Sequence, residues 1–332
     1  MESIPLHNDI KTRTGDYQRY IANYQQSLRN VAAGVFDVRY NFMPVVDWTR
    51  TNLYYTLPNQ SQALRFEMND IAAYDVYILK RTSAEQDYAP EVLHKAKARL
   101  DVMSEQEKAL LEKNLIAGLP GGEGSYDRDG IRATIEEFIA LGDEGMRANL
   151  FTFLREVVPV AEKVGVRLAI HPDDPPFSLF GLPRVVSTQA DARALLAAAK
   201  SPANGLTLCA GSYGARGDND LVDMVREFGE NIYFVHLRNI KREADGSFYE
   251  SDHLDGDNDM VGLIDALLSE EKRRRSSNST LPPIAMRPDH GHLMGDEIGK
   301  AGINPGYSYA GRMRGLAELR GVIHTLETLA AR

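Results

Sequence analysis

The feature that most constrains the fold is a regular alternation of short apolar runs with longer amphipathic stretches along the 332 residues. The apolar runs are rich in β-branched and aromatic residues, and they cover residues 36–42, 166–171, 205–209, 231–236 and 284–287. The amphipathic stretches cover residues 15–32, 128–164, 188–200, 219–228, 260–275 and 313–330. Strands that alternate with helices predict βαβ units and a parallel sheet. Residues 168–170 and 233–235 are continuously apolar, as expected of strands covered on both faces.

One long segment interrupts this alternation after an early strand. Residues 58–126 carry helical patterns, and Ser104 with Glu107 fits a capping box at the start of one helix. The segment ends in a glycine-rich loop at residues 118–125. We expect a helical insertion within a single barrel domain of residues 1–332. This insertion is either a cap over the functional site or a peripheral helical segment without a role in function.

Composition narrows the classes of partner. The chain has 47 acidic and 38 basic residues and a net charge of −9, so it lacks the broad basic surface that nucleic acids require. The basic run at residues 272–275 is short and follows two acidic residues, and we interpret it as the solvated end of a helix. Cys209 is the only cysteine, which excludes an intramolecular disulfide and favours a cytoplasmic location. Neither a signal peptide nor an apolar run of membrane-spanning length is expected.

Side chains that can bind a metal ion follow four successive apolar strands. His171, Cys209 and His236 come at the ends of three strands, and Asp289 follows the last one. In a parallel α/β barrel the C-terminal ends of the strands converge on one mouth, so we expect these side chains to meet. Two imidazoles, a thiolate and a carboxylate form a suitable ligand set for a divalent transition metal.

Each of these residues also has a structural interpretation. A histidine at the end of a strand can simply form a hydrogen bond, and Cys209 can act as a small buried hydrophobic residue. Asp289 can cap a following helix. Because the four residues occupy four consecutive strand ends, a shared metal site is the favoured interpretation.

Two arginines lie beside the predicted ligands. Arg238 and Arg287 would reach the same mouth, where a guanidinium suits bidentate capture of a substrate carboxylate. The alternative for each is an ion pair with a neighbouring carboxylate, such as Asp173 or Asp174. Both interpretations stay open at the level of sequence.

Candidate acid and base groups lie near the last strand. They are His290, Tyr307 and Tyr309, and the two tyrosines belong to a turn-forming loop at residues 304–309. The pKa of a tyrosine beside a divalent cation or an arginine can be lowered enough for proton transfer. The alternative is that these tyrosines only pack.

Several strings of residues resemble those of the mannonate dehydratase family. They are HPDDPP at residues 171–176, LCAGSY at 208–213, FVHLR at 234–238 and MRPDHGH at 286–292. Further matches are YNFMP at residues 40–44, DWTR at 47–50, NPGY at 304–307 and GRMRGLAELRG at 311–321. The resemblance covers nearly the whole chain. It implies a TIM-type (β/α) barrel that converts D-mannonate to 2-keto-3-deoxy-D-gluconate and water, a step of hexuronate (glucuronate) catabolism.

The resemblance also implies a cofactor and roles for individual residues. It implies Mn²⁺ or Fe²⁺, whereas ligand softness alone would favour zinc. The metal ligands of the family fall on His171, Cys209, His236 and Asp289. Its catalytic neighbourhood falls on Arg287, His290 and Tyr307. We expect the substrate to be contacted by Arg238 and Asn41.

In one respect the chain departs from the family pattern. The family has further N-terminal βα units before the stretch that resembles residues 2–7, so we expect an incomplete barrel with open sheet edges. Two other functions stay open. One is a sugar isomerase or epimerase on a metal-bearing barrel, which would typically use more carboxylate ligands. The other is a non-catalytic sugar-acid-binding protein on a degenerate barrel. The oligomeric state is also open, and a homo-oligomer such as a dimer is compatible with the sequence.

Overall fold

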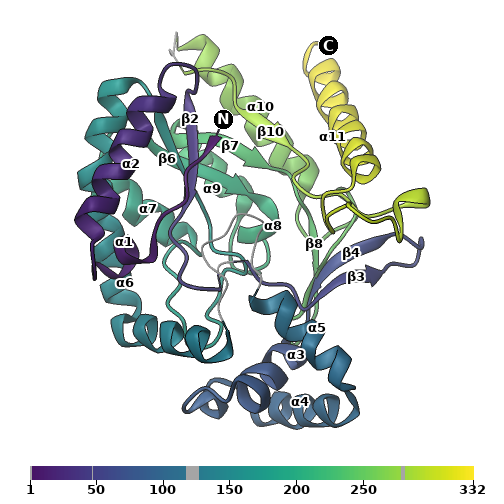
Figure 1. Ribbon diagram of the computed structural model, residues 1–332. Coiled ribbons are helices and arrows are strands. Elements are labelled where there is room, and N and C mark those ends of the chain that lie inside the picture. Colours follow the sequence, from purple (N-terminus) through teal and green to yellow (C-terminus); the bar gives the residue numbers. More distant parts are fainter. Residues whose placement is uncertain (1, 47, 117–126, 278–280) are drawn as a thin grey trace.

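The computed structural model describes residues 2–46, 48–116, 127–277 and 281–332, and its centre is a six-stranded parallel sheet (Figure 1). In spatial order the strands are β1 (Glu2–Ser3), β2 (Asp37–Asn41), β5 (Arg167–His171), β6 (Asn204–Cys209), β7 (Ile232–His236) and β10 (Ala285–Arg287). All five strands predicted from the sequence are present. Within the described residues β1 and β10 form the two edges, so the sheet is open.

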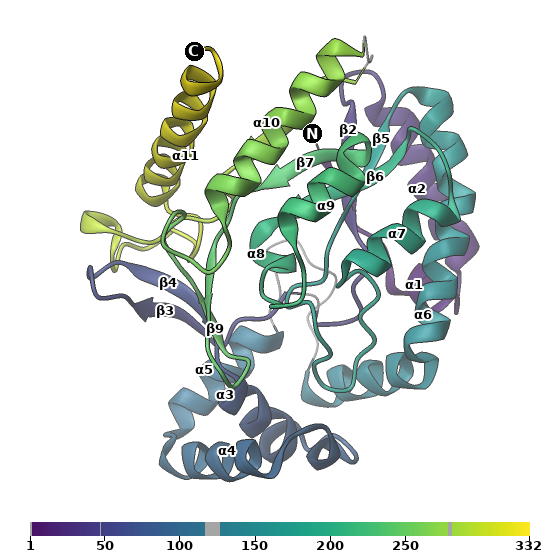
Figure 2. The ribbon, with the colours of Figure 1, turned by 180° about the vertical axis from the view of Figure 1, so that it is seen from behind.

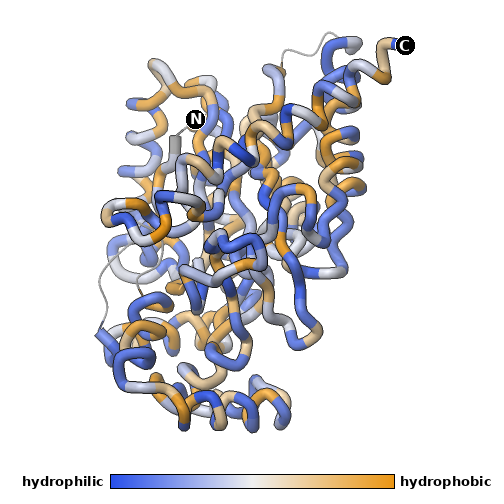
Figure 3. The backbone as a smooth tube through the Cα atoms, turned by 90° about the vertical axis from the view of Figure 1, so that its right-hand side faces the viewer, coloured by the Kyte–Doolittle hydropathy of each residue, from blue (hydrophilic) through white to orange (hydrophobic). Residues whose placement is uncertain are grey.

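Helices cover the outer face of this sheet (Figures 1 and 2). They are α1 (Asn8–Thr12), α2 (Tyr17–Val31), α6 (Arg128–Val164), α7 (Gln189–Ala198), α9 (Leu221–Phe228) and α10 (Met260–Ser276), and the C-terminal α11 (Tyr309–Ala330) packs against α10. Hydrophobic and hydrophilic residues are interspersed along the helical parts of the backbone, as Figure 3 shows. No helix in the described part of the chain combines the length and the apolarity needed to cross a membrane.

The two faces of the sheet have different roles because successive side chains of a strand point to opposite sides. Val38 of β2 and the pair Leu168 and Ile170 of β5 lie in the hydrophobic core. The alternate residues of β5, Ala169 and His171, point to the opposite face. Residues 168–170 of β5 and 233–235 of β7 are all buried, which confirms the prediction of strands covered on both faces.

A second, antiparallel sheet lies beside the first and was not predicted. Its order is β3 (Asn52–Thr56), β4 (Gln62–Phe66), β9 (Phe248–Glu250) and β8 (Ile240–Arg242). Strands β3 and β4 form a hairpin, and β9 pairs with β4 although it lies far along the chain. The sheet therefore joins an early segment to the segment that follows β7.

The predicted helical insertion begins later than expected. Residues 62–66 form β4, so the prediction of helix from residue 58 is wrong for the first part of the segment, where a turn at Gln60 with a φ of 67° closes the hairpin. The helical part comprises α3 (Met68–Ala73), a π-helix (Tyr74–Leu79), a 3₁₀-helix (Ala84–Asp87), α4 (Pro90–Val102) and α5 (Glu105–Ile116). The capping box is confirmed, because Ser104 and Glu107 exchange side-chain-to-backbone hydrogen bonds. The predicted glycine-rich loop lies outside the described residues.

The basic run at the end of α10 is only partly solvated. Arg274 is 3 % exposed, and its guanidinium donates hydrogen bonds to the backbone carbonyls of Gly229 and Ile232 and to the Glu270 side chain. The interpretation of this run as a solvated helix end is therefore wrong for Arg274. This arginine ties α10 to the start of β7.

Candidate metal centre and active site

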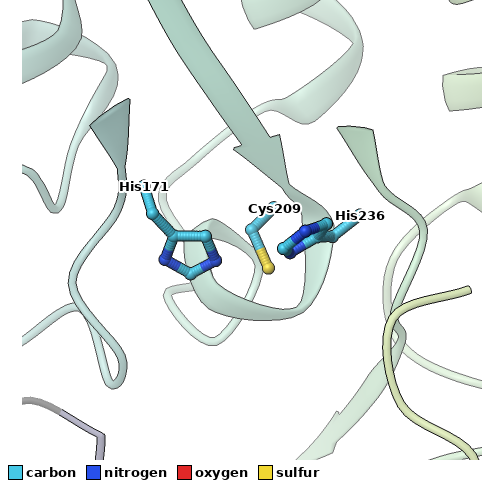
Figure 4. A group of neighbouring side chains, drawn as sticks. All are labelled: His171, Cys209 and His236. Carbon is cyan, nitrogen blue, oxygen red and sulfur yellow. The ribbon is translucent and has the colours of Figure 1, made fainter. Parts of the chain in front are cut away.

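Three ligand-type side chains meet at the C-terminal ends of neighbouring parallel strands. His171, Cys209 and His236 end β5, β6 and β7, and one ligand atom from each lies within 4.8 Å of the others (Figure 4). Cys209 and His236 are register partners in adjacent strands. The convergence predicted from the strand ends is confirmed for these three residues.

The two histidines have the hydrogen-bonding pattern that metal ligands need. His171 donates from Nδ1 to the carbonyl of Pro172 at 2.8 Å, which leaves the lone pair of Nε2 free. Neither ring nitrogen of His236, which is 0 % exposed, has a hydrogen-bond partner among the described residues. An unsatisfied buried imidazole is costly, and a bound cation would satisfy it. The residues present therefore fit a metal ion.

Burial also keeps both imidazoles neutral. Desolvation lowers the pKa of His171 to about 3 and lowers that of His236 well below its ordinary value. A neutral imidazole is the form that binds a metal ion.

This depression predicts how acid affects the metal-free protein. Between about pH 6.5 and the lower pKa of the folded state, the unfolded chain binds protons at these histidines and the folded chain does not. The free energy of unfolding should then decrease as the pH falls, by up to about 1.4 kcal/mol per pH unit for each histidine. Urea unfolding of the chelator-treated protein at several pH values between 7.5 and 5 measures this pH dependence of the free energy of unfolding.

A control separates this effect from the titration of carboxylates. The pKa of Glu250 is lowered to about 2, so its stabilising contribution is complete above about pH 4.5 and is lost only below that. Replacing His171 and His236 together with asparagine should flatten the slope between pH 7.5 and 5. An unchanged slope in that double variant would contradict the assignment.

The thiol of Cys209 is surrounded by hydrogen-bond donors. Burial raises its pKa, whereas the guanidinium of Arg238 opposes that effect. Ser212 donates to Sγ at 3.2 Å, and Nη2 of Arg238 lies 3.8 Å from Sγ. Both contacts favour the thiolate, which is the form that binds a metal ion.

Asp289 lies beside this cluster and is not one of the three converging residues. Its Oδ2 is 3.4 Å from Nδ1 of His236, and its Oδ1 accepts a hydrogen bond from Arg287 at 2.8 Å. Its backbone has a φ of 70°, a left-handed conformation that is uncommon outside glycine and costs free energy. Burial alone would raise its pKa, but the positive charges beside it, among them Arg238 and Arg287, hold the pKa well below the ordinary range. The ligand role of Asp289 stays a prediction.

Arg238 belongs to a buried network of alternating charges. Asp174 accepts hydrogen bonds from Arg50 at 3.0 Å and from Arg238 at 2.6 Å. Glu250 accepts from the same two guanidiniums at 3.0 and 3.2 Å. All four side chains are at most 3 % exposed. Gly211 in α8 (Ala210–Tyr213) lies directly against Arg238, and a Cβ atom there would overlap the guanidinium.

The predicted ion pair of Arg238 with a neighbouring aspartate is therefore present, and the partner is Asp174. The role of Arg238 in binding the substrate stays a prediction. Arg287 is different: its side chain is 46 % exposed and lies over the ring of Phe234 at 5.4 Å. Of the two arginines, Arg287 is the more accessible to an anion.

His290 and Tyr307 lie together beside the cluster. Their ring centroids are 5.0 Å apart in an edge-to-face arrangement, and a bridge between Gly291 and Tyr307 joins the two segments. Nδ1 of His290 is 2.7 Å from Oε2 of Glu250. Tyr309 is 72 % exposed at the start of α11, which separates it from this group.

The surroundings of Tyr307 raise its pKa above the ordinary value. Burial raises it, and the nearby carboxylates Asp289 and Glu250 raise it further. The neutral phenol is therefore the resting form in this structure, and it suits a proton donor.

Asn41 lies at the same edge of the sheet. It ends β2, is half-buried and is the register partner of His171. On the other side Arg287 is the register partner of His236. These two residues therefore flank the cluster, and their contacts with a substrate stay predictions.

Sequence reasoning missed Glu250, which the structure places in contact with Arg238 and His290. It ends the three-residue strand β9, which is too short to give a clear pattern in the sequence. Its partners Arg50 and Arg238 lie 200 and 12 residues away, so only the fold brings them together.

Comparisons with known proteins show the family of this chain. The family model of D-mannonate dehydratase (UxuA) matches residues 1–332. The mannonate dehydratase of Saccharophagus degradans is 71 % identical over 330 residues, which are 99 % of this chain and 83 % of that protein. Mannonate dehydratase 2 of Agrobacterium fabrum is 58 % identical over 327 residues, which are 98 % of this chain and 82 % of that protein.

A solved structure agrees as well. The crystal structure of mannonate dehydratase from Streptococcus suis serotype 2 matches with a TM-score of 0.73 and 31 % identity, over 100 % of this chain and 78 % of that one. The open parallel sheet, with its helices on the outer face, thus has the α/β TIM-type fold that the sequence predicts. The family model matches the whole chain, a relative is 71 % identical to it, and a solved structure of a mannonate dehydratase is similar. The chain therefore belongs to the D-mannonate dehydratase (UxuA) family.

Proposed function

We propose that this chain is a hydro-lyase that dehydrates D-mannonate to 2-keto-3-deoxy-D-gluconate, in hexuronate catabolism. The observation that carries the proposal is the cluster of His171, Cys209 and His236 beside the pair His290 and Tyr307. Membership of the family supports the choice of substrate. The site supplies the two chemical functions that the reaction needs, positive charge and proton transfer.

The reaction is difficult in water for two reasons. The proton on C2, next to the carboxylate, is very weakly acidic, and the hydroxyl on C3 is a poor leaving group. We propose that His171, Cys209 and His236, with Asp289, hold Mn²⁺ or Fe²⁺. When bound, such an ion supplies Lewis-acid stabilisation of negative charge on the substrate, an effect that amounts to several kcal/mol.

The chain's own residues then have distinct roles. Arg287 is accessible and binds the substrate carboxylate through its guanidinium. Asn41 and Arg238 form further polar contacts with the substrate. His290 takes the C2 proton, because Glu250 stabilises the protonated imidazole by a hydrogen bond at Nδ1. Tyr307 retains its proton and delivers it to the departing C3 hydroxyl, so that water leaves. The resulting enol gives the 2-keto product when C3 takes the proton from His290 and the enol hydroxyl returns a proton to Tyr307, so both residues regain their starting forms.

The experiment that tests this function is turnover of D-mannonate by the purified chain. Protein stripped with a chelator should lose activity, and Mn²⁺ should restore it, with the 2-keto-3-deoxy acid as product. D-Altronate serves as the comparison substrate. No product with either Mn²⁺ or Fe²⁺ would contradict the proposed function.

The two alternative functions predict different outcomes in the same assay. A sugar isomerase or epimerase would form no 2-keto-3-deoxy acid. A non-catalytic protein would bind the sugar acid without turnover. The intact ligand cluster favours an enzyme, and the cysteine within it distinguishes the site from the carboxylate-rich sites expected of isomerases.

We further propose that residues 1–332 act as one barrel domain, with the helical insertion as part of it. The proposed substrate is a small sugar acid, and neither nucleic acid nor membrane is a proposed partner. We also propose that the protein is cytoplasmic and forms a homo-oligomer such as a dimer.

A further inference from the structure

We propose that Glu250 is a positioning residue for the dehydration, which orients the ring of His290 and fixes its proton on Nδ1. The inference rests on the proposed function, in which His290 is the base. Glu250 comes from the antiparallel sheet, whereas the cluster of ligand-type residues lies on the parallel sheet. The proposal thus assigns a role in the reaction to the second sheet.

The hydrogen bonds around Nδ1 of His290 determine which tautomer is present. Both carboxylate oxygens of Glu250 lie close, at 2.7 and 2.9 Å, and Nη1 of Arg238 lies farther away at 3.3 Å. A lone pair on Nδ1 would face the carboxylate at 2.7 Å and repel it. A proton on Nδ1 forms a charge-assisted hydrogen bond there. We therefore assign the neutral ring the Nδ1–H form.

This tautomer presents the correct nitrogen to the site. With the proton on Nδ1, the lone pair belongs to Nε2, which lies 3.8 Å from Oδ2 of Asp289 on the side of the ligand cluster. Tyr307 packs against the same ring. The opposite tautomer would direct an N–H toward the cluster and remove the base.

Glu250 is itself held rigidly. Its side chain is 3 % exposed, and the guanidiniums of Arg50 and Arg238 keep it ionised and fix its orientation. Its backbone lies in β9, between β4 and β8, and its carbonyl accepts a hydrogen bond from His292 at 3.0 Å. A group fixed in this way can hold a catalytic ring in one orientation.

The activity test compares Glu250→Gln with the wild-type protein, both loaded with Mn²⁺. The glutamine keeps the volume but can donate to Nδ1 as well as accept from it, so the tautomer is no longer fixed. We expect kcat to fall by about 100-fold and KM to change by less than about threefold, with unchanged metal content. Glu250→Asp keeps the charge and should recover part of kcat.

A matched control lies two residues along the chain. Asp252 also pairs with a histidine, since its Oδ1 is 3.3 Å from Nδ1 of His292. Asp252→Asn should leave kcat within about threefold of wild type. A loss in Asp252→Asn equal to that in Glu250→Gln would overturn the proposal, because loss of any carboxylate–imidazole pair would then have the same effect.

Two further measurements separate positioning from a general structural role. In a His290→Gln background, Glu250→Gln should cause no additional loss of kcat, because Glu250 acts through His290. An additional 100-fold loss in that background would overturn the proposal. The second measurement is ¹⁵N NMR of the wild-type protein loaded with diamagnetic Zn²⁺, with His290 assigned by comparison with His290→Gln.

The NMR measurement does not depend on turnover or on the folding of Glu250 variants. The expected spectrum shows the proton of His290 on Nδ1, and a proton on Nε2 would overturn the proposal. Failure of the proposed function has a different signature, namely an Nδ1–H ring in a chain that forms no 2-keto-3-deoxy acid.

Discussion

Cys209→Ala is expected to leave the protein without its metal ion and without dehydratase activity. The thiolate is one of three ligand atoms gathered within 4.8 Å, and a methyl group cannot replace it. Changes in the surroundings of metal ligands already cost 10- to 100-fold in metal affinity, so we expect the loss of a ligand to cost more than about 100-fold. Metal analysis after dialysis, together with kcat for D-mannonate, measures both effects.

Thr207→Val provides a control from the same strand. Thr207 is buried two residues before Cys209, and its hydroxyl donates a hydrogen bond to the carbonyl of Ala169 at 3.1 Å. This variant removes a buried polar contact but no ligand, so metal content should remain at the wild-type level. Full metal occupancy in Cys209→Ala would remove Cys209 from the ligand set.

The convergence of the three ligand-type side chains could be predicted because their positions follow from local pattern and general topology. Each follows an apolar run, and the ends of parallel strands meet at one edge whatever the details of packing. His171, Cys209 and His236 therefore needed no knowledge of long-range contacts. The same logic predicted five of the six strands of the parallel sheet and the longer helices around it, because their apolar periodicity is local.

The antiparallel sheet could not be predicted in this way. Its strands have three to five residues, too few for a clear alternation, and β4 pairs with β9 across more than 180 residues of sequence. Residues 58–66 consequently appeared to belong to the helical insertion. The network around Arg238 depends on this sheet, because Glu250 is at the end of β9 and Arg50 lies just before β3.

Asp289 could be predicted from the sequence only in part. Its position after β10 is a local signal, and it does lie at the site, 3.4 Å from His236. Its left-handed backbone, its contact with Arg287 and its pKa depend on the assembled fold. The sequence thus predicts where Asp289 lies, while its function as a ligand needs a measurement.

Tyr307→Phe is expected to lower kcat by about 1000-fold while the metal content stays unchanged. The change removes one oxygen atom from a side chain that packs edge-to-face against His290, so the packing is preserved. General acid–base groups contribute about 10²- to 10⁴-fold to rates, and the phenol that this change removes is the proposed proton donor to the departing hydroxyl. Steady-state kinetics with Mn²⁺-loaded protein measure the loss.

Tyr309→Phe is the matched control for this substitution. It makes the same chemical change two residues later, on a side chain that is 72 % exposed, and it should leave kcat within about twofold of wild type. If kcat survives in Tyr307→Phe, Tyr307 only packs, and the proton for the leaving hydroxyl must come from another group. His290 is the nearest ring, so it would then have to serve both as base and as acid, and His290→Gln alone would abolish both proton transfers.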